Sequence, residues 1–274
     1  MTDLSGHKVL VTGCRGRIGA AVTRVLLAAG ASVRGLDLSP HQDGSADGDG
    51  ASAGSEPTGP GNGAARYSYA VCDVSDRTAV EAAINGLEGE LGHLDGLVNA
   101  HGIFPNTALL DMDQDEWDRV FAVNTRGSML TMQAMFRRWI ARGSPGAIVN
   151  VSSCAATSPR AGGGHYSGSK AALDALTAVA AIEGGPYGIR ANTVAPGLVL
   201  DEVHHRDGGE QLDPYFRLAL EGTPLGRTGA PTDIARTVGF LLSDASSWTS
   251  GAVVQVSGGS HAGRTHIPVT GGLR

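Results

Sequence analysis

Apolar and polar positions alternate along this chain in two distinct patterns. Short apolar runs that end near glycine or a polar residue predict strands, whereas longer alanine-rich stretches with apolar residues at helical spacing predict helices. The predicted strands cover 7–13, 31–38, 66–76, 93–102, 146–153, 188–197 and 251–257. The predicted helices cover 20–29, 77–91, 114–142, the stretch that contains 166–170, and 231–243, whereas 198–230 is irregular and polar. This alternation predicts a single α/β domain over 1–262: a doubly wound, Rossmann-type parallel sheet with helices on both faces.

Two segments fall outside this pattern. Residues 40–65 consist almost entirely of Gly, Ala, Ser, Asp and Pro, which cannot bury enough apolar surface to offset their chain entropy. We therefore expect a disordered surface insertion there. The C-terminal tail, 263–274, is expected either to contact a neighbouring subunit or to fray.

Charge and composition narrow the possible partners. The chain of 274 residues has 21 basic and 27 acidic side chains and a net charge of −6, which disfavours nucleic acid and anionic membranes as partners. No apolar run approaches the length of about 18 residues that a membrane helix needs, and the N-terminus does not resemble a signal peptide. The three cysteines are far apart, which favours reduced thiols. We expect a cytoplasmic protein.

The first strand-to-helix turn is rich in glycine. Gly13, Gly16 and Gly19 allow a tight turn and a close approach of the backbone to a pyrophosphate at the helix N-terminus. Asp37 ends the second predicted strand, where a carboxylate accepts ribose hydroxyls and repels a 2′-phosphate. The pattern therefore predicts NAD as cofactor rather than NADP. Arg15 and Arg17, either of which could reach a phosphate, leave NADP as the alternative.

Lysine is rare in this chain, which makes one lysine conspicuous. Of the 21 basic side chains only Lys8 and Lys170 are lysines, and Lys170 stands four residues after Tyr166, on the same helical face. A free tyrosine has a pKa of about 10, too high for a base at neutral pH, and a nearby cation is expected to lower it. The pair therefore suggests proton transfer to or from an alcohol.

Beyond these two sites, ordered motifs recur along the chain. They are T-G-x-x-G-x-x-G at 12–19, Cys72-Asp73-Val74, L-V-N-A-H-G at 97–102, F-A-V-N-T-R-G around Asn124, I-V-N-V-S-S at 148–153, Tyr166-x-x-x-Lys170, N-T-V-A-P-G at 192–197 and P-L-G-R-T-G-A-P-T-D-I-A at 224–235. With these motifs the chain resembles the short-chain dehydrogenase/reductase family, in its single-domain form, from about residue 6 to 262.

The resemblance implies roles for particular residues. The catalytic set would be Asn124, Ser153, Tyr166 and Lys170, with Tyr166 as general acid/base, Ser153 bonded to the substrate oxygen and Asn124 ordering a water. The cofactor would contact the following residues: Gly13, Arg17, Ile18, Gly19, Asp37, Leu38, Asp73, Val74, Asn99, Ala100, Tyr166, Lys170, Pro196, Gly197 and Val199. The family also implies a homotetramer, or a homodimer, that assembles through the helix that carries Tyr166.

Three positions depart from the family pattern. Arg17 stands where single-domain members usually have the middle glycine, which is at Gly16 here. His101 is expected to be either a pH-sensitive group or, preferably, a packed loop histidine with its polar atoms satisfied. Asp201 replaces a threonine that bonds the nicotinamide carboxamide; it would accept from the carboxamide and favour oxidised NAD, or cap a helix.

The substrate is left open by these patterns. Residues 200–222 occupy the place of the substrate-covering loop, and we expect a lid over a small or medium-sized alcohol or ketone. His204 and His205 are adjacent and lack a third ligand, so no metal site is expected. The predicted function is hydride transfer between NAD(H) and a secondary alcohol or ketone. The alternatives are a dihydrodiol or sugar-alcohol dehydrogenase and a non-catalytic NAD-sensing regulator.

Overall fold

The structure, a computed structural model, describes residues 2–38, 66–206 and 212–263. The predicted insertion at 40–65 lies outside the described residues, and so does the predicted tail except for Gly263.

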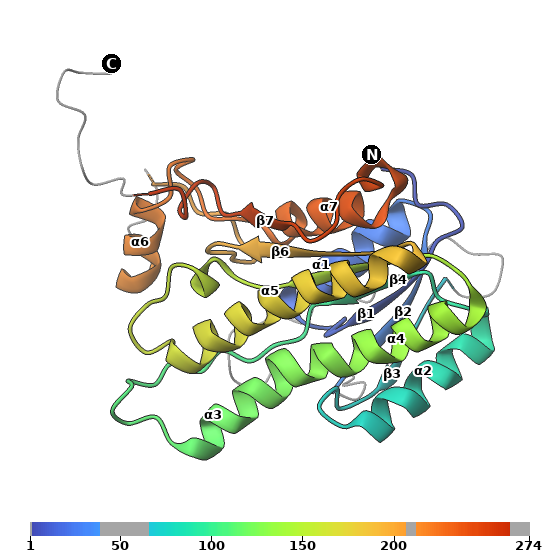
Figure 1. The fold of residues 1–274 in the computed structure, drawn as a ribbon. Helices are drawn as coiled ribbons and strands as arrows, with labels where there is room; N and C mark the ends of the chain where they lie inside the picture. Colours follow the sequence, from blue (N-terminus) through green and yellow to red (C-terminus); the bar gives the residue numbers. More distant parts are fainter. Residues whose placement is uncertain (1, 39–65, 207–211, 264–274) are drawn as a thin grey trace.

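Within the described residues, seven strands form one sheet, and every pair of neighbours is parallel. Their order across the sheet is β3-β2-β1-β4-β5-β6-β7, which confirms the predicted doubly wound arrangement (Figure 1). The strands are β1 (Lys8–Thr12), β2 (Ser32–Asp37), β3 (Tyr67–Val71), β4 (Gly96–Asn99), β5 (Gly146–Val151), β6 (Ile189–Pro196) and β7 (Val253–Val256). β3 ends five residues before the predicted boundary at 76, because the chain turns at Asp73 and Asp76 then caps the following helix.

Helices cover both faces of the sheet. They are α1 (Arg17–Ala28), α2 (Arg77–Leu91), α3 (Gln114–Phe121), α4 (Ser128–Arg142), α5 (Gly164–Gly184), α6 (Pro214–Glu221) and α7 (Pro231–Leu242), with short 3₁₀ turns η2 (Cys154–Ala156), η3 (Gly185–Tyr187) and η5 (Asp244–Ser246). Side chains alternate along β1: Val9 and Val11 pack with α1 and α7, whereas Leu10 packs with α2, α4 and α5. The central strands β1, β4 and β5 are therefore buried on both sides, as their apolar runs predicted, whereas the edge strands β3 and β7 are only partly buried.

The helix predicted over 114–142 is interrupted. α3 and α4 are joined by a π-helical segment, η1 (Ala122–Gly127), which contains Asn124. Phe121 and Ser128, which flank the segment, keep helical backbone angles, and no side chain caps it, so it has no clear signature in the sequence. Such π segments often occur at functional sites.

A second difference lies in 198–230, which was expected to be irregular. α6 forms within it, because Asp213 accepts a hydrogen bond from Tyr215 N and Pro214 occupies the first helical position.

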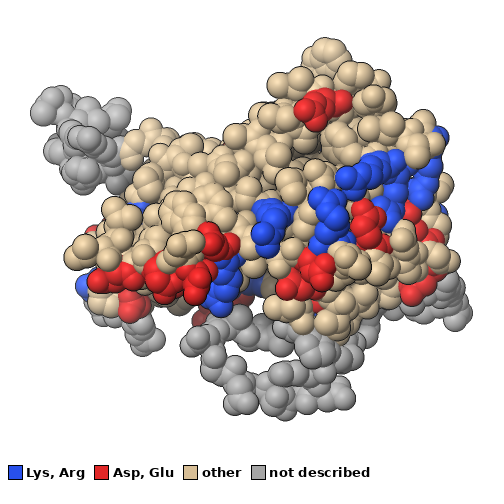
Figure 2. Space-filling view, turned by 60° about the horizontal axis from the view of Figure 1, so that its bottom comes forward, with Lys and Arg blue, Asp and Glu red and all other residues tan. Residues whose placement is uncertain are grey.

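Charged side chains on the face that carries α2, α3 and α4 are mixed in sign. In the visible part of that face, basic groups lie beside acidic ones and do not form one continuous basic surface (Figure 2). Arg142 Nη2, for example, lies 2.7 Å from Glu88 Oε2, and Arg138 Nη1 lies 2.9 Å from Glu81 Oε2. Over the described ranges, no helix has both the length and the apolar character to span a membrane. The cytoplasmic location stays a prediction.

Candidate active site

The glycine turn between β1 and α1 admits no side chain at two positions. Gly13 has a φ of +62°, and a Cβ there would lie 2.7 Å from the Cα of His101. A Cβ on Gly19 would overlap the carbonyl of Gly13. Gly16 precedes α1 and supplies no side-chain cap, so the first amides of the helix are open to an anion. This cradle fits the pyrophosphate of a dinucleotide.

Asp37 lies at the carboxyl end of β2, next to that turn. Its Oδ2 accepts a hydrogen bond from Arg15 N at 2.9 Å. The guanidinium of Arg15 lies over the ring of Tyr69, 5.2 Å from its centroid, and donates to the Tyr69 hydroxyl at 3.3 Å. Nearby, exposed Asp73 accepts from the amide and hydroxyl of Ser75. The ends of β2 and β3 thus offer carboxylates at the place expected for the adenosine ribose.

Arg17, the first residue of α1, forms an ion pair with Asp201, which lies in the segment after β6, at the carboxyl edge of the sheet. Arg17 Nε lies 3.1 Å from Asp201 Oδ2, and Arg17 Nη1 donates to the carbonyl of Val199 at 3.3 Å. The first α-helix described after Asp201, α6, is capped by Asp213 instead. Asp201 therefore does not cap that helix; its carboxylate joins the segment after β6 to the glycine turn. Pro196 and Gly197 lead into this segment, and a Cβ on Gly197 would lie 2.9 Å from Ser257.

The structure brings the four predicted catalytic residues to the carboxyl ends of β4 and β5. Ser153 follows β5, Asn124 lies in η1, and Tyr166 and Lys170 lie in the first turns of α5. The ammonium of Lys170 is 5.9 Å from the centroid of the Tyr166 ring and donates to the carbonyl of Val151 at 2.8 Å. Asn124 Oδ1 and Lys170 Nζ both face Gly102, 3.2 Å and 3.4 Å from where its Cβ would be.

Burial dominates the ionisation of Tyr166 and Lys170, the two predicted proton-transfer groups. Burial raises the pKa of Tyr166, and the hydrogen bond with Ser153 and the charge of Arg160 only partly oppose that rise. Burial also lowers the pKa of Lys170 to about 8, against the opposing charge of Asp174. In this structure burial is the dominant effect on the Tyr166 pKa, and the lowering expected from Lys170 stays a prediction. The Tyr166 side chain is partly buried, and the ammonium of Lys170 is directed to the Val151 carbonyl.

Asn124 and Asn99 have side chains that are largely engaged by the protein. Asn124 Nδ2 donates to the carbonyl of Ile103 and to Ser169 Oγ, so only acceptor capacity is left for a water. Asn99 is buried, donates to Asn150 Oδ1 and accepts from Thr131 Oγ1. The side chain of Asn99 therefore braces β4 against β5 and α4, and contact between Asn99 and the cofactor stays a prediction.

His101 is a packed histidine whose ring nitrogens both have hydrogen-bond partners, which agrees with the preferred of the two predictions. Its Nε2 donates to the carbonyl of Val123 at 3.1 Å, and its Nδ1 contacts Thr12 Oγ1. Burial, together with the charge of Lys170, lowers the pKa of His101 to about 3, and the hydrogen bond with Val123 opposes this shift.

This depressed pKa predicts acid sensitivity. In the unfolded chain His101 takes up a proton as the pH falls below about 6.5, but the folded protein resists protonation down to about pH 3. Its contribution to stability is thus complete above pH 6.5 and is lost as the pH falls toward 3. We expect the free energy of unfolding of His101→Ala to decline less steeply with acidification than that of the wild type. Urea unfolding at a series of pH values measures this, and equal slopes would contradict the shift.

The exposed side of Tyr166 is bordered by residues that the motifs did not point to. The ring of Phe104, 68% exposed, meets the Tyr166 ring edge-on at 6.3 Å. Arg160 donates to Asn106 Oδ1 at 2.6 Å and lies over the ring of Tyr215 in α6, 5.2 Å from its centroid. The short α6 helix therefore lies at the substrate side of the site. Phe104 closely follows the L-V-N-A-H-G motif, and this position is the only sequence signal that could have pointed to it as a neighbour of the site.

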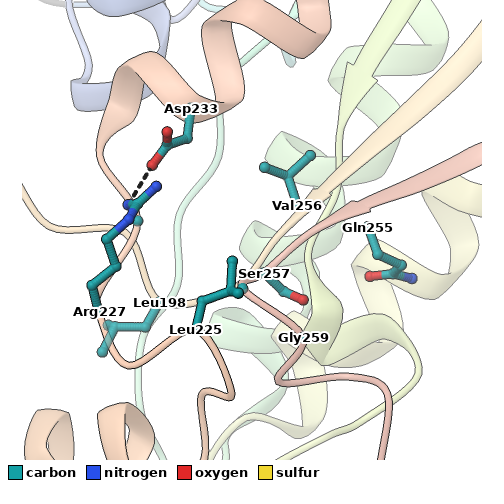
Figure 3. A pocket seen from close by; sticks show the side chains of 10 residues that line it. Leu198, Leu225, Arg227, Asp233, Gln255, Val256, Ser257 and Gly259 are labelled. Carbon is teal, nitrogen blue, oxygen red and sulfur yellow. Dashed lines mark hydrogen bonds and ion pairs between the residues drawn. The ribbon is translucent and has the colours of Figure 1, made fainter. Parts of the chain in front are cut away.

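A cavity of about 340 Å³ lies beyond the end of β7 (Figure 3). Arg227 and Asp233 form an ion pair on its wall, 2.8 Å apart, and Asp233 Oδ2 also accepts from Ala230 N at the start of α7. This pair closes the first turn of α7, a structural role. Within the described ranges no cluster of three or more His, Cys, Asp or Glu side chains could hold a metal ion.

Comparison with known proteins gives consistent results. A family model described as Enoyl-(Acyl carrier protein) reductase matches residues 14–261. The chain is 35% identical to D-threitol dehydrogenase of Mycolicibacterium smegmatis, over 93% of this chain and 93% of that protein. It is 36% identical to L-rhamnose 1-dehydrogenase (NAD(P)(+)) of a Sphingomonas species, over 95% and 98%. A crystal structure of a short-chain type dehydrogenase/reductase from Mycobacterium marinum superposes with a TM-score of 0.78 at 30% identity, covering 94% of this chain and 96% of that one.

Proposed function

The chain belongs to the short-chain dehydrogenase/reductase family, whose members use NAD(P) to act on CH–OH groups, and on that premise we propose a specific reaction. It transfers a hydride between NAD(H) and a secondary alcohol or ketone of small or medium size, with Tyr166 as general acid/base. The single observation that carries this proposal is the placement of Tyr166, half-buried and hydrogen-bonded to Ser153, beside the buried ammonium of Lys170.

Each residue has a separate task in this scheme. Ser153 donates to the substrate oxygen and holds it beside the Tyr166 hydroxyl. In alcohol oxidation the Tyr166 oxygen takes the hydroxyl proton, and in ketone reduction it returns one. When bound, the nicotinamide supplies the hydride chemistry. Lys170 stabilises negative charge on the phenol oxygen, and the remaining acceptor capacity of Asn124 holds a water from which the proton is replaced.

The proposed reaction is tested by a substrate screen. Wild-type protein is incubated with secondary alcohols, sugar alcohols, sugars and hydroxyacyl thioesters in one direction, and with the matching ketones in the other. NADH or NADPH absorbance reports turnover. A non-catalytic sensor would bind the cofactor and turn over none of them. The named relatives are dehydrogenases, and all four catalytic residues are present here, so we favour the enzyme.

We also propose that NAD is preferred over NADP, because of Asp37. An Asp37→Asn substitution keeps an acceptor for the Arg15 amide but removes the negative charge. We expect the ratio of kcat/KM with NAD to kcat/KM with NADP to fall by at least about tenfold, since the charge no longer repels the 2′-phosphate. Initial rates with both cofactors measure this ratio, and an unchanged ratio would remove Asp37 as the determinant.

The α4–α5 face supports the proposed assembly with further copies of the chain. An apolar groove of about 480 Å³ runs between these helices and is lined by Met129, Phe136, Ile140, Leu176 and Val179, among others. Beside it Ala171, Ala175 and Ala178 are exposed on α5, so a second helix could approach closely. We propose that this face pairs with its copy in a dimer or tetramer, which sedimentation of the wild-type protein would measure.

A further inference from the structure

The helix that carries Tyr166 begins without the usual cap. α5 starts at Gly164, and the preceding Gly163 has no side chain to accept from the free amides of the first turn. Gly162 has a φ of +76°, and a Cβ there would overlap Asn106 Oδ1. Three consecutive glycines give this approach to the catalytic tyrosine little stiffness of its own.

The amide of Tyr166 is one of those free amides. The helical hydrogen bonds begin one residue later, where Ser167 N donates to the carbonyl of Gly163 at 2.8 Å. Tyr166 N donates instead to Nδ1 of the preceding residue, His165, at 2.8 Å. The imidazole thus caps the helix from within, at the catalytic residue itself.

The other ring nitrogen of His165 is held by a carboxylate from a different helix. His165 is fully buried, and its Nε2 lies 2.9 Å from Oε1 of Glu116 in α3. Because Nδ1 accepts from the Tyr166 amide it carries no proton, so the single proton of a neutral ring is on Nε2 and is donated to Glu116.

Glu116 is itself held in place. Its amide donates to the Asp113 side chain at 2.6 Å, and a hydrogen bond with Thr107, followed by the one with His165, lowers the pKa of its carboxyl. Thr107 N in turn donates to the carbonyl of Gly162, at the glycine approach to α5. Two routes therefore link Glu116 in α3 to the start of α5. One runs through His165 to the backbone of Tyr166, and the other runs through Thr107 to the carbonyl of Gly162.

We propose that His165 and Glu116 are positioning residues: Glu116 fixes the imidazole with its acceptor toward the Tyr166 amide, and the imidazole fixes the phenol of Tyr166 relative to Ser153 and Lys170. This inference rests on the proposed role of Tyr166 as general acid/base. A pair that only joined α3 to α5 would affect unfolding without a selective effect on turnover.

Two amide substitutions test the two ring nitrogens of His165 one at a time. In His165→Asn the amide oxygen takes the place of Nδ1 and can accept from the Tyr166 amide, whereas in His165→Gln the amide nitrogen takes the place of Nε2 and reaches only Glu116. Glu116→Gln keeps an acceptor for Nε2, and Glu116→Ala removes it. Asp115→Ala, which removes an exposed carboxylate from the same turn of α3, is the matched control.

We expect His165→Gln and Glu116→Ala to lower kcat by roughly tenfold with the KM for the cofactor unchanged, because small displacements of a catalytic group slow chemistry strongly. His165→Asn should recover most of the loss, and Glu116→Gln and Asp115→Ala should stay within about twofold of wild type. Equal losses in His165→Asn and His165→Gln, or an unchanged kcat in Glu116→Ala, would overturn the proposal. Glu116 lies at the surface edge of the pair, so its variants test the idea even where a His165 variant fails to fold.

Turnover by Tyr166→Phe distinguishes failure of the proposed function from failure of the positioning role of His165 and Glu116. If that variant retains turnover, the proposed function fails. If it is inactive while Glu116→Ala turns over at the wild-type rate, the proposed function stands and the positioning role fails.

Discussion

Tyr166→Phe should lose turnover almost completely while still binding its cofactor. Removing the hydroxyl removes the only group of this ring that can exchange a proton with the substrate. General acid/base groups typically contribute about 10²- to 10⁴-fold to rate, so we expect kcat to fall by about 10³-fold. The ring itself is kept, and with it the edge-on contact to Phe104. The measurement is kcat with the best substrate from the screen, together with titration of NADH binding.

A second tyrosine gives the control. Tyr187, half exposed in η3, is remote from the carboxyl edge of the sheet, and Tyr187→Phe should leave kcat unchanged. Cofactor affinity in Tyr166→Phe should stay within about threefold of wild type, since binding rests mainly on the glycine turn and Asp37. A Tyr166→Phe enzyme with more than a tenth of wild-type kcat would exclude Tyr166 as the proton donor.

The sheet was predictable because each strand carries its own signature. A parallel strand buried on both faces is apolar throughout, and the helix that follows it has a different period, so β1, α1 and α2 are recognisable from their residues alone. The grouping of the site at one edge follows from the same fact, since parallel strands place their carboxyl ends together.

Features that depend on distant residues were not predictable in this way. The spacing of Tyr166 and Lys170 gave their proximity, but the direction of the Tyr166 pKa shift depends on how deeply the rest of the chain buries the ring. Arg17 and Asp201 are 184 positions apart, and His165 and Glu116 are 49 apart, so neither pairing has a local pattern. The start of α6 did carry a local signal, because Asp213 followed by Pro214 is typical of a helix N-terminus. The polar residues around it favoured an irregular segment instead.

Lys170 should resist replacement even by arginine, the residue that this chain otherwise prefers. Its side chain is buried, its ammonium donates to the carbonyl of Val151, and it lies 3.4 Å from the place where a Cβ on Gly102 would be. A guanidinium is larger and planar, and cannot occupy that slot with the same charge position. We therefore expect Lys170→Arg and Lys170→Met each to lower kcat by about 10²-fold or more.

The two variants should differ in the reason for their loss. Lys170→Met keeps the length of the side chain but removes the charge. Because burial lowers the pKa of Lys170 to about 8, folding at pH 7 must bury an ammonium at a cost that disappears as the pH rises from 8 toward 10.5. Any stability gained by Lys170→Met at pH 7 should thus shrink above pH 8. Lys170→Arg keeps a buried charge and, with added bulk, should lower Tm.

Lys8 is the matched control, because it is the only other lysine in the sequence. Lys8→Arg makes the same chemical change in β1, away from the catalytic groups, and should leave kcat within about twofold of wild type. If Lys170→Arg also retained wild-type kcat, a positive charge alone would be sufficient at this position. The compact, buried ammonium would then not be a requirement of the reaction, and the scarcity of lysine in this chain would have no bearing on its chemistry.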